Sequence, residues 1–385
     1  MDVFDFGNYK PLSGSWNGGF NGGFNGRFNG GFNGGFSQVG LGGSPLLADA
    51  LRRSREATCN LNLKPRYRSW DHVLPPAGSE QEKLLKKLRR WDFSVNLQLA
   101  LHELLQPISY AASGEAVSIF VNGTKSLTMR RPSFDLLGAE LQEVADLAQL
   151  REDRSSEILI QAADTMPFWG AILPLSSDKT PYTILLLTIA TQLSSYVLMR
   201  LKHEFACPRP FELCPDIQPM IPTPRHGAFP MGHVSEAVIV CSILSALTKN
   251  EGSDEWKSMT LQLERLAFRI GQNRVVAGVH YPVDLVAGMV IGKWLARFVV
   301  SACQDRDDIV ISEKPQIFNA HDLKPSERQE FIDHPENLAI DSADTTVKPA
   351  AALRKSALMG AIFAVARAEW DWLDTAAPKP IGNTM

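Results

Sequence analysis

Long segments with apolar residues at helical spacing occupy most of the chain after residue 40. In residues 79–105, leucines and other apolar residues recur every three or four positions, which is typical of an amphipathic helix. Further helices are predicted near 134–165, 180–206, 233–249, 255–277, 282–301 and 351–374. Because few strand-like runs alternate with these segments, a parallel α/β sheet is disfavoured and an α-helical bundle is predicted.

Residues 116–129 are the exception to the helical pattern. Two short β-prone runs lie there on either side of Asn122 and Gly123. Asn-Gly is the strongest short-range hairpin signal, because both residues readily adopt the positive φ that a tight hairpin turn needs. The predicted fold class is therefore all-α, a multi-helix bundle with at most a small β-hairpin.

The amino-terminal segment is of low complexity. Residues 1–37 contain a Phe-Asn-Gly repeat with a period of four residues. Glycine raises the entropy of the backbone and asparagine favours turns, so no regular element is expected there. We therefore divide the chain into a low-complexity tail, 1–37, and a single α-helical domain, 38–385.

The charge balance and the cysteines exclude several classes of protein. The 39 Lys and Arg residues against 42 Asp and Glu give a net charge of −3, whereas nucleic-acid binders usually carry a basic excess. The five cysteines form no Cys-x-x-Cys pair, so neither a zinc site nor a disulfide framework is expected. The first residues are acidic and lack an apolar run, so no secretory signal is predicted.

The longest uncharged run extends from Pro181 to Met199, which is long enough to cross a bilayer. It contains several threonine, serine and glutamine residues, and we interpret it as a buried core helix. We therefore expect no transmembrane span and a cytoplasmic location with reduced thiols. The oligomeric state is left open between a monomer and a homo-oligomer.

Three short blocks between residues 202 and 284 carry the residues suited to chemistry. They are Lys202-HEFACP-Arg209-Pro210, Pro230-Met231-Gly232-His233 and Arg274-VVAGV-His280-YPV-Asp284. Each block lies at an expected helix boundary. Prolines end the first helix, Gly232 opens the second, and Pro282 suits the first position of the third, which places Asp284 in its first turn.

If the three blocks converge, they build a site for a tetrahedral oxyanion. Lys202, Arg209 and Arg274 supply positive charges and N–H donors, and arginine forks suit phosphate or vanadate. The backbone N–H groups of Gly232 and His233 open a helix, which is a favourable place for an anion.

Two histidines and a carboxylate complete the set. One of His233 and His280 would be a nucleophile or a ligand of a metal oxyanion, and the other a general acid–base. Asp284 would orient the His280 imidazole through its other ring nitrogen. A lone lysine, arginine or histidine is more often structural, but three blocks in this order favour a functional site.

The three blocks closely resemble the superfamily of type 2 phosphatidic acid phosphatases, bacterial class A acid phosphatases and vanadium-dependent haloperoxidases. The pattern of that superfamily is K-x6-RP, then PSGH, then SR-x5-H-x3-D, and the resemblance covers about 202–284. It implies a shared α-helical bundle with the oxyanion pocket among its helices, within residues 180–301 of this chain.

The resemblance implies a role for each matching residue. Lys202, Arg209 and Arg274 would bind the non-bridging oxygens of the anion. A backbone N–H would come from Gly232, and His233 would be the acid–base.

The resemblance also implies roles for the last two residues of the third block. His280 would be the nucleophile of a phosphatase or the axial ligand of vanadium in a haloperoxidase. Asp284 would support His280.

Three residues bear on selectivity. Met231 replaces the serine of PSGH, whose hydrogen bond to a charged group is worth roughly 1.5–3 kcal/mol. Asn273 stands where phosphatases usually have serine and some haloperoxidases have asparagine. His226, seven residues before His233, resembles the bromide-preferring haloperoxidases. We therefore expect His226 and Met231 to line the pocket and set its selectivity.

The leading interpretation is a vanadium-dependent haloperoxidase, an oxidoreductase with vanadate at His280 as cofactor; phosphate can occupy the same site. Its partners would be hydrogen peroxide, a halide (bromide or iodide rather than chloride) and a small organic substrate. The absence of a predicted signal and of multiple spans favours it, as does the long helical region before the site. The alternatives are a soluble acid phosphatase with a histidine nucleophile and a weakened member that binds an oxyanion without turnover.

Overall fold

The computed structural model describes residues 84, 88, 91–249, 253–303, 316–321, 323–333 and 356–371. The low-complexity segment 1–37 and most of 79–90 lie outside the described residues. The division of the chain into a tail and one domain therefore stays a prediction.

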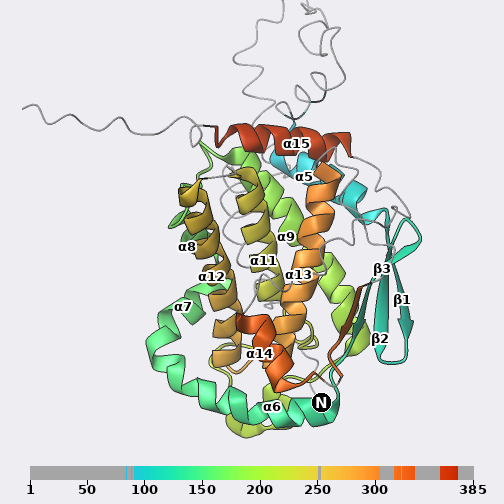
Figure 1. Cartoon of the computed structure of the whole chain (residues 1–385), viewed down its shortest axis with the longest axis vertical. Helices are drawn as coiled ribbons and strands as arrows, with labels where there is room; N and C mark the ends of the chain where they lie inside the picture. The colour runs from blue at the N-terminus through green and yellow to red at the C-terminus, as the bar shows by residue number, and fades with distance from the viewer. Residues whose placement is uncertain are drawn as a thin grey trace, which may run out of the picture.

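Helices dominate the described residues, which confirms the predicted mainly α-helical fold (Figure 1). The α-helices are α5 (Phe93–Leu105), α6 (Phe134–Leu147), α7 (Arg151–Ala163), α8 (Met166–Gly170), α9 (Pro181–Phe205), α10 (Pro210–Leu213), α11 (Gly232–Leu247), α12 (Asp254–Val276), α13 (Pro282–Cys303), α14 (Pro325–Asp333) and α15 (Ala357–Ala368). Two short 3₁₀ helices are η5 (Ala148–Leu150) and η6 (Pro215–Ile217). The strands are β1 (Ile108–Ser113), β2 (Ala116–Val121), β3 (Thr124–Arg130) and β4 (Gln316–Asn319).

Helix α11 lies at the centre of the bundle, packed against α9, α12 and α13 (Figure 1). Two glycines of α13 permit the close approach of α13 to α11. A Cβ atom at Gly292 would lie 2.8 Å from the backbone oxygen of Ser235, and one at Gly288 would lie closer still to that of Met231. Because real Cβ atoms do not approach backbone oxygens so closely, these positions require glycine. The contact brings the start of α11 against the start of α13.

The strands form one sheet in the order β1-β2-β3-β4, with β4 parallel to β3 and the other pairs antiparallel. The predicted hairpin is confirmed: Val121 pairs with Thr124 across Asn122 and Gly123, whose φ angles are 49° and 79°. The sheet is larger than the predicted hairpin. Strand β1 is mostly exposed and shows no apolar alternation, and β4 lies in a polar stretch and pairs with a distant strand.

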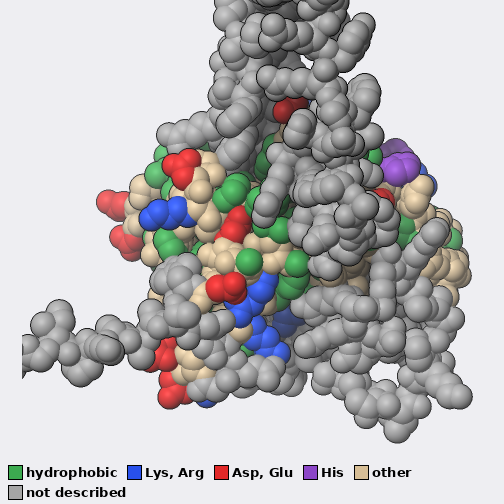
Figure 2. Space-filling view, turned by 90° about the horizontal axis from the view of Figure 1, so that it is seen from above, with side chains coloured by type: hydrophobic (Ala, Val, Ile, Leu, Met, Phe, Trp, Pro, Cys, Tyr) green, Lys and Arg blue, Asp and Glu red, His purple; other side chains and the backbone are tan. Residues whose placement is uncertain are grey.

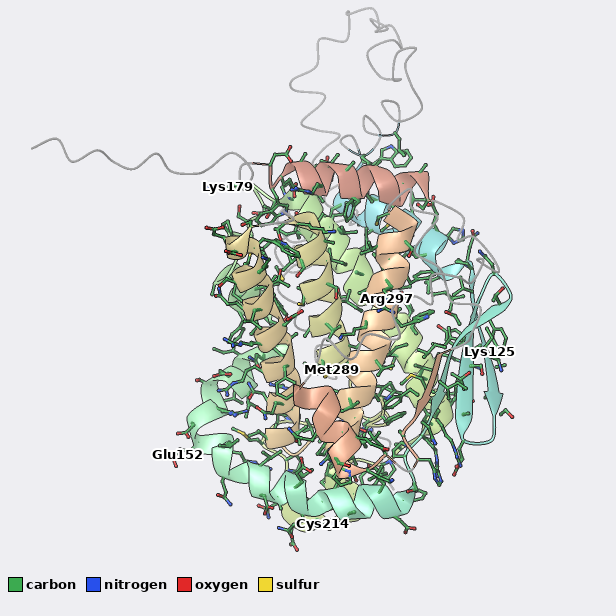
Figure 3. The ribbon with its side chains drawn as sticks, in the orientation of Figure 1. Lys125, Glu152, Lys179, Cys214, Met289 and Arg297 are labelled. Carbon is green, nitrogen blue, oxygen red and sulfur yellow. The ribbon has the colours of Figure 1, made fainter. Side chains whose placement is uncertain are left out.

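The sheet packs on the bundle through its alternating buried positions. Val117, Ile119 and Val121 of β2 are buried, as period-two alternation requires for a sheet with one covered face. The indole Nε1 of Trp294 on α13 donates to Oγ of Ser126 on β3 at 2.8 Å. Figure 3 labels Lys125 on the exposed side of this sheet.

The carboxyl-terminal helix α15 lies across one end of the bundle and fixes the start of α9 (Figure 1). The carboxylate of Glu369 accepts the backbone N–H groups of Tyr182 and Thr183, each at 2.8 Å. The buried indole of Trp370 donates to Oγ1 of Thr183 at 2.9 Å, as expected of a core anchor. These bonds satisfy N–H groups that have no partner inside the first turn of a helix. Figure 2, which views this end, shows acidic and basic side chains on the same described surface.

Two helical segments are long and apolar enough to cross a membrane, Pro181–Leu213 and Pro282–Cys303. The expectation of no transmembrane span is therefore wrong. It discounted the first segment for its hydroxyl groups, but Thr188 and Thr191 donate to backbone oxygens of their own helix. It missed the second because charged residues such as Arg297, labelled on α13 in Figure 3, interrupt that run. In the structure, 72% and 83% of the most apolar windows are buried.

Candidate active site

The first block anchors the site at the end of α9. Lys202 lies in the last turn of this helix, and its Nζ atom donates to the backbone oxygens of Gly227 at 2.9 Å and Ala228 at 2.7 Å. The helix gives way at the cap residue Ala206, which has a left-handed φ of 47°, and Pro208 prevents its continuation. The buried Lys202 side chain is thus hydrogen-bonded to the loop that precedes α11.

Arg209 connects the first block to the third. Its side chain is buried, and Nη1 donates to the backbone oxygen of Val279, next to His280, at 2.7 Å. The backbone N–H of Arg209 donates to the carboxylate of Glu212 at 2.6 Å, which fixes the turn after α9. Arg209 and His280 therefore lie in the same buried region.

His226 lies beside Arg209. Its Nδ1 atom is 3.3 Å from Nη2 of Arg209 and 3.0 Å from the backbone oxygen of Gly227. Burial, together with the nearby charge of Lys202, lowers the pKa of His226 to about 3. His226 is therefore a neutral side chain of the site at physiological pH, where sequence analysis places a selectivity residue.

Arg274 is held by α7, which the sequence did not link to the site. Its Nη2 atom donates to the backbone oxygen of Ile158 at 2.9 Å, and the preceding Asn273 donates to Glu157 and Gln161 at 2.9 Å each. Nε and Nη1 of Arg274 have no hydrogen-bond partner among the described residues. Burial lowers the pKa of Arg274 to about 10, so it remains a cation at neutral pH. A buried cation with two donors to spare suits an oxyanion.

His280 and Asp284 form a buried pair. Nδ1 of His280 lies 2.9 Å from Oδ2 of Asp284, and the same oxygen accepts the backbone N–H of Tyr281 at 3.0 Å. Burial and the charges of Arg209 and Lys202 hold the pKa of His280 well below its usual range. A neutral imidazole must then carry its proton on Nδ1 to donate to Asp284, which leaves Nε2 for chemistry.

His233 stands in the first turn of α11, directly after Gly232. Burial and then the charges of Arg274 and Lys202 hold the pKa of His233 well below its usual range. The backbone N–H of the neighbouring Met231 donates to the backbone oxygen of Asp284 at 2.9 Å, which places the second block against the third. The N-terminus of α11 also brings its positive dipole end to this place.

Met231 ties the second block to the third. Its backbone N–H donates to the backbone oxygen of Asp284 at 2.9 Å, and its side chain is fully buried. The position of the family serine therefore carries an apolar side chain that adds no hydrogen-bond donor.

The structure thus brings together all the site residues predicted from the sequence; the roles assigned to them stay predictions. These residues are Lys202, Arg209, His226, Met231, Gly232, His233, Arg274, His280 and Asp284. Sequence analysis missed the side chains that hold them from outside the blocks. Glu157 lies 116 residues from Asn273 in the chain, and Glu140 lies 143 residues from Val283, and no local pattern links such partners.

Within the described residues, no three His, Cys, Asp or Glu side chains gather as a metal site would require. The described cysteines Cys207, Cys214, Cys241 and Cys303 are free thiols. Figure 3 labels Cys214 at the end of the bundle opposite α15. The site is therefore built from cations, histidines and one carboxylate.

Residues 181–308 match the sequence model of the family described as the PAP2 superfamily. All three blocks lie inside this match, so the chain carries a PAP2 superfamily domain.

Two curated proteins resemble part of the chain. One, an undecaprenyl-diphosphatase from Sulfolobus acidocaldarius, is 30% identical over 105 residues, which cover 27% of this chain and 44% of the relative. The other, described as bacitracin transport permease protein BcrC from Bacillus licheniformis, is 30% identical over 91 residues, covering 24% of this chain and 41% of the relative. The chain thus spans less than half the length of either relative.

One solved structure is also similar to part of the chain. It is described as a transmembrane PAP2 type phosphatidylglycerolphosphate phosphatase from Bacillus subtilis. The similarity has a TM-score of 0.35 and a sequence identity of 19%, and it covers 44% of this chain and 85% of that one.

These findings overturn the haloperoxidase interpretation. Residues 181–308 match the PAP2 superfamily and one curated relative is a diphosphatase, so the peroxidase and oxidoreductase assignments are wrong, as are peroxide, halide and an organic substrate as partners. The interpretation gave weight to Asn273, but the structure gives this residue a packing role against Glu157 and Gln161. The cytoplasmic location is also contradicted, by the two apolar helical segments and by the relative described as a transport permease protein.

Proposed function

We propose that this protein is a phosphatase that removes a terminal phosphate through a phosphohistidine formed on His280. The observation that carries the proposal is the buried His280–Asp284 pair in one site with Lys202, Arg209 and Arg274. The PAP2 superfamily match over residues 181–308 supports it.

In the first step, Nε2 of His280 attacks the phosphorus atom. An N–P bond forms, and the P–O bond to the leaving group breaks. Asp284, at 2.9 Å from Nδ1, stabilises the positive charge that develops on the imidazole. Lys202, Arg209 and Arg274 offset the charge on the non-bridging oxygens, where fixed donors contribute most to a transition state.

His233 moves the proton in both steps. It donates a proton to the leaving oxygen in the first step, and in the second it accepts one from the water that attacks phosphorus. That attack breaks the N–P bond and releases inorganic phosphate. Burial and nearby cations lower the pKa of His233, and the negative charge of a bound phosphate opposes the effect of those cations.

A lipid-linked phosphate or diphosphate is the substrate class we propose. The name of the Sulfolobus relative supports it, as do the two apolar helical segments that suit an enzyme working at a bilayer. Vanadate, expected from the sequence as a resident cofactor, has in this proposal the role of a phosphate mimic. As a tetrahedral oxyanion it would occupy the same donors and inhibit turnover.

The test measures phosphate release by the purified full chain in detergent, with p-nitrophenyl phosphate and with a long-chain prenyl diphosphate. Release that vanadate inhibits and that His280→Ala abolishes is the expected result. His102→Ala, at an exposed histidine of α5, is the matched control and keeps full activity. Vanadate binding without release from either substrate would contradict the proposal and favour a member that only binds an oxyanion.

A further inference from the structure

We infer that Glu140 of α6 is a positioning residue for the His280–Asp284 pair, an inference that rests on the proposed function. Glu140 is buried, and its Oε2 atom accepts the backbone N–H of Val283 at 3.0 Å. Val283 is the second residue of α13 and directly precedes Asp284. The bond therefore fixes the turn from which Asp284 reaches His280.

The start of α13 needs such an outside acceptor. The first N–H groups of a helix have no partner within it, and Pro282 at the first position has no N–H. The Oδ2 atom of Asp284 accepts from His280 and from the backbone of Tyr281, and Oδ1 accepts no hydrogen bond from Val283 or any other described residue. A carboxylate from a distant helix supplies what the local sequence does not.

Arg328 of α14 completes the arrangement. Its guanidinium donates from Nη1 to Oε1 of Glu140 and from Nη2 to Oε2 of Glu143. Figure 1 shows α14 in front of α13 and close to α6. Both oxygens of Glu140 therefore accept hydrogen bonds, Oε1 from Arg328 of α14 and Oε2 from Val283 of α13.

The charges around Glu140 indicate that its carboxylate lies close to the site. Burial raises the pKa of Glu140 to about 7, and the positive charge of Arg328 opposes that rise. The negative charge of Asp284 raises the pKa of Glu140 further, so the two carboxylates lie within electrostatic reach of each other. The three anion-binding cations donate to the backbone oxygens of Gly227, Ala228, Val279 and Ile158, whereas Glu140 accepts from Val283 and Arg328.

Because Glu140 bonds to the turn that carries Asp284, whereas other groups hold the anion-binding cations, we predict that its loss lowers the rate of turnover but not the affinity for the anion. Losing the anchor at Val283 shifts the turn that orients His280, and a misplacement of about 1 Å costs on the order of 10²-fold in rate. Lys202, Arg209 and Arg274 keep their positions, so the affinity for vanadate changes little. A merely structural role would lower both properties together.

The experiment compares Glu140→Gln with Glu143→Gln in the full-length protein. Glutamine has a single acceptor oxygen, and because the charged Arg328 is the stronger donor it takes that oxygen, which leaves the amide NH2 facing the N–H of Val283. Both positions lie on α6 and both contact Arg328, but only Glu140 bonds to α13 among the described residues. We expect Glu140→Gln to lower kcat for p-nitrophenyl phosphate by about 10- to 100-fold, with a vanadate inhibition constant within about twofold of the parent. Glu143→Gln stays within about twofold in both. Hydrogen exchange in a peptide spanning residues 280–290 rises in Glu140→Gln alone.

Equal exchange in the two variants would overturn the inference, as would increased exchange in Glu140→Gln with an unchanged kcat. A vanadate constant that rises as much as kcat falls would also overturn it. If the parent releases no phosphate, the proposed function fails. The exchange comparison then still decides whether Glu140 holds the turn.

Discussion

Nδ1 of His280 and Oδ2 of Asp284 lie 2.9 Å apart across the start of α13, with His280 just before the helix and Asp284 in its first turn. The same carboxylate oxygen accepts the backbone N–H of Tyr281, so the helix start and the imidazole share one acceptor. The geometry selects one tautomer of His280 and presents Nε2. This relationship supports the proposal that His280 is the nucleophile.

Asp284→Asn tests that relationship. The neutral amide of asparagine cannot stabilise the positive charge that develops on the His280 imidazole. We therefore expect kcat to fall by about 10²- to 10⁴-fold. The measurement is kcat on p-nitrophenyl phosphate together with the thermal unfolding midpoint. Asp254→Asn is the matched control, because Asp254 also lies in the first turn of a helix and is exposed. An unchanged kcat in Asp284→Asn would remove Asp284 from the mechanism.

Arg274→Lys tests the role of the guanidinium fork. Lysine keeps the charge but loses the planar set of donors, of which Nε and Nη1 are unpartnered among the described residues. We expect the dissociation constant for vanadate, measured by calorimetry, to rise about 10- to 100-fold. Arg265→Lys, at an exposed position of the same helix, serves as control. Equal affinities in the two variants would place Arg274 outside the anion site.

Met231→Ser returns the family residue to the second block. The new hydroxyl adds a donor to a charged oxyanion, so we expect vanadate to bind about 10-fold more tightly or better. The same change removes a fully buried side chain and lowers stability by about 2 kcal/mol or more. Inhibition assays and denaturant titrations measure the two effects. Unchanged inhibition would show that residue 231 does not reach the anion.

The site histidines predict a loss of stability in acid. The pKa of His226 is lowered to about 3, and those of His233 and His280 are lowered as well. The unfolded chain, with histidines near pH 6.5, therefore binds more protons than the folded one, and stability falls as the pH drops from about 6.5 toward 3. Urea titrations at several pH values should show this fall, and His226→Asn should reduce it.

His102→Asn, at an exposed histidine, should leave the pH dependence of stability unchanged. A flat dependence between about pH 6.5 and 4 in the parent would contradict the assignment of buried neutral histidines.

Local signals in the sequence placed the main helices well. Prolines and caps set the ends of α9 and α13, and their observed bounds differ by at most two residues from the expected ones. Strand β4 and helix α14 lie between the predicted helices 282–301 and 351–374, where no element was predicted. Strand β4 has no apolar pattern of its own and depends on pairing with β3.

The site residues were predictable because they occur in three compact blocks at helix ends. Their supports were not, since Glu140, Glu157 and Arg328 act across long separations in the chain. The haloperoxidase interpretation rested in part on the expected absence of membrane spans, which the two apolar helical segments contradict. Asn273 was interpreted as favouring haloperoxidases over phosphatases, whereas in the structure its amide donates hydrogen bonds to Glu157 and Gln161 of α7.

The central claim is a covalent bond between phosphorus and His280. The most direct measurement is rapid base quench of the enzyme during turnover of ³²P-labelled substrate, followed by tryptic digestion. The peptide from residue 275 to Lys293 contains His280 as its sole histidine. The account predicts an acid-labile, base-stable label on this peptide that chases to inorganic phosphate and is absent from His280→Ala. Steady turnover with no label on the peptide, or turnover that survives in His280→Ala, would contradict it.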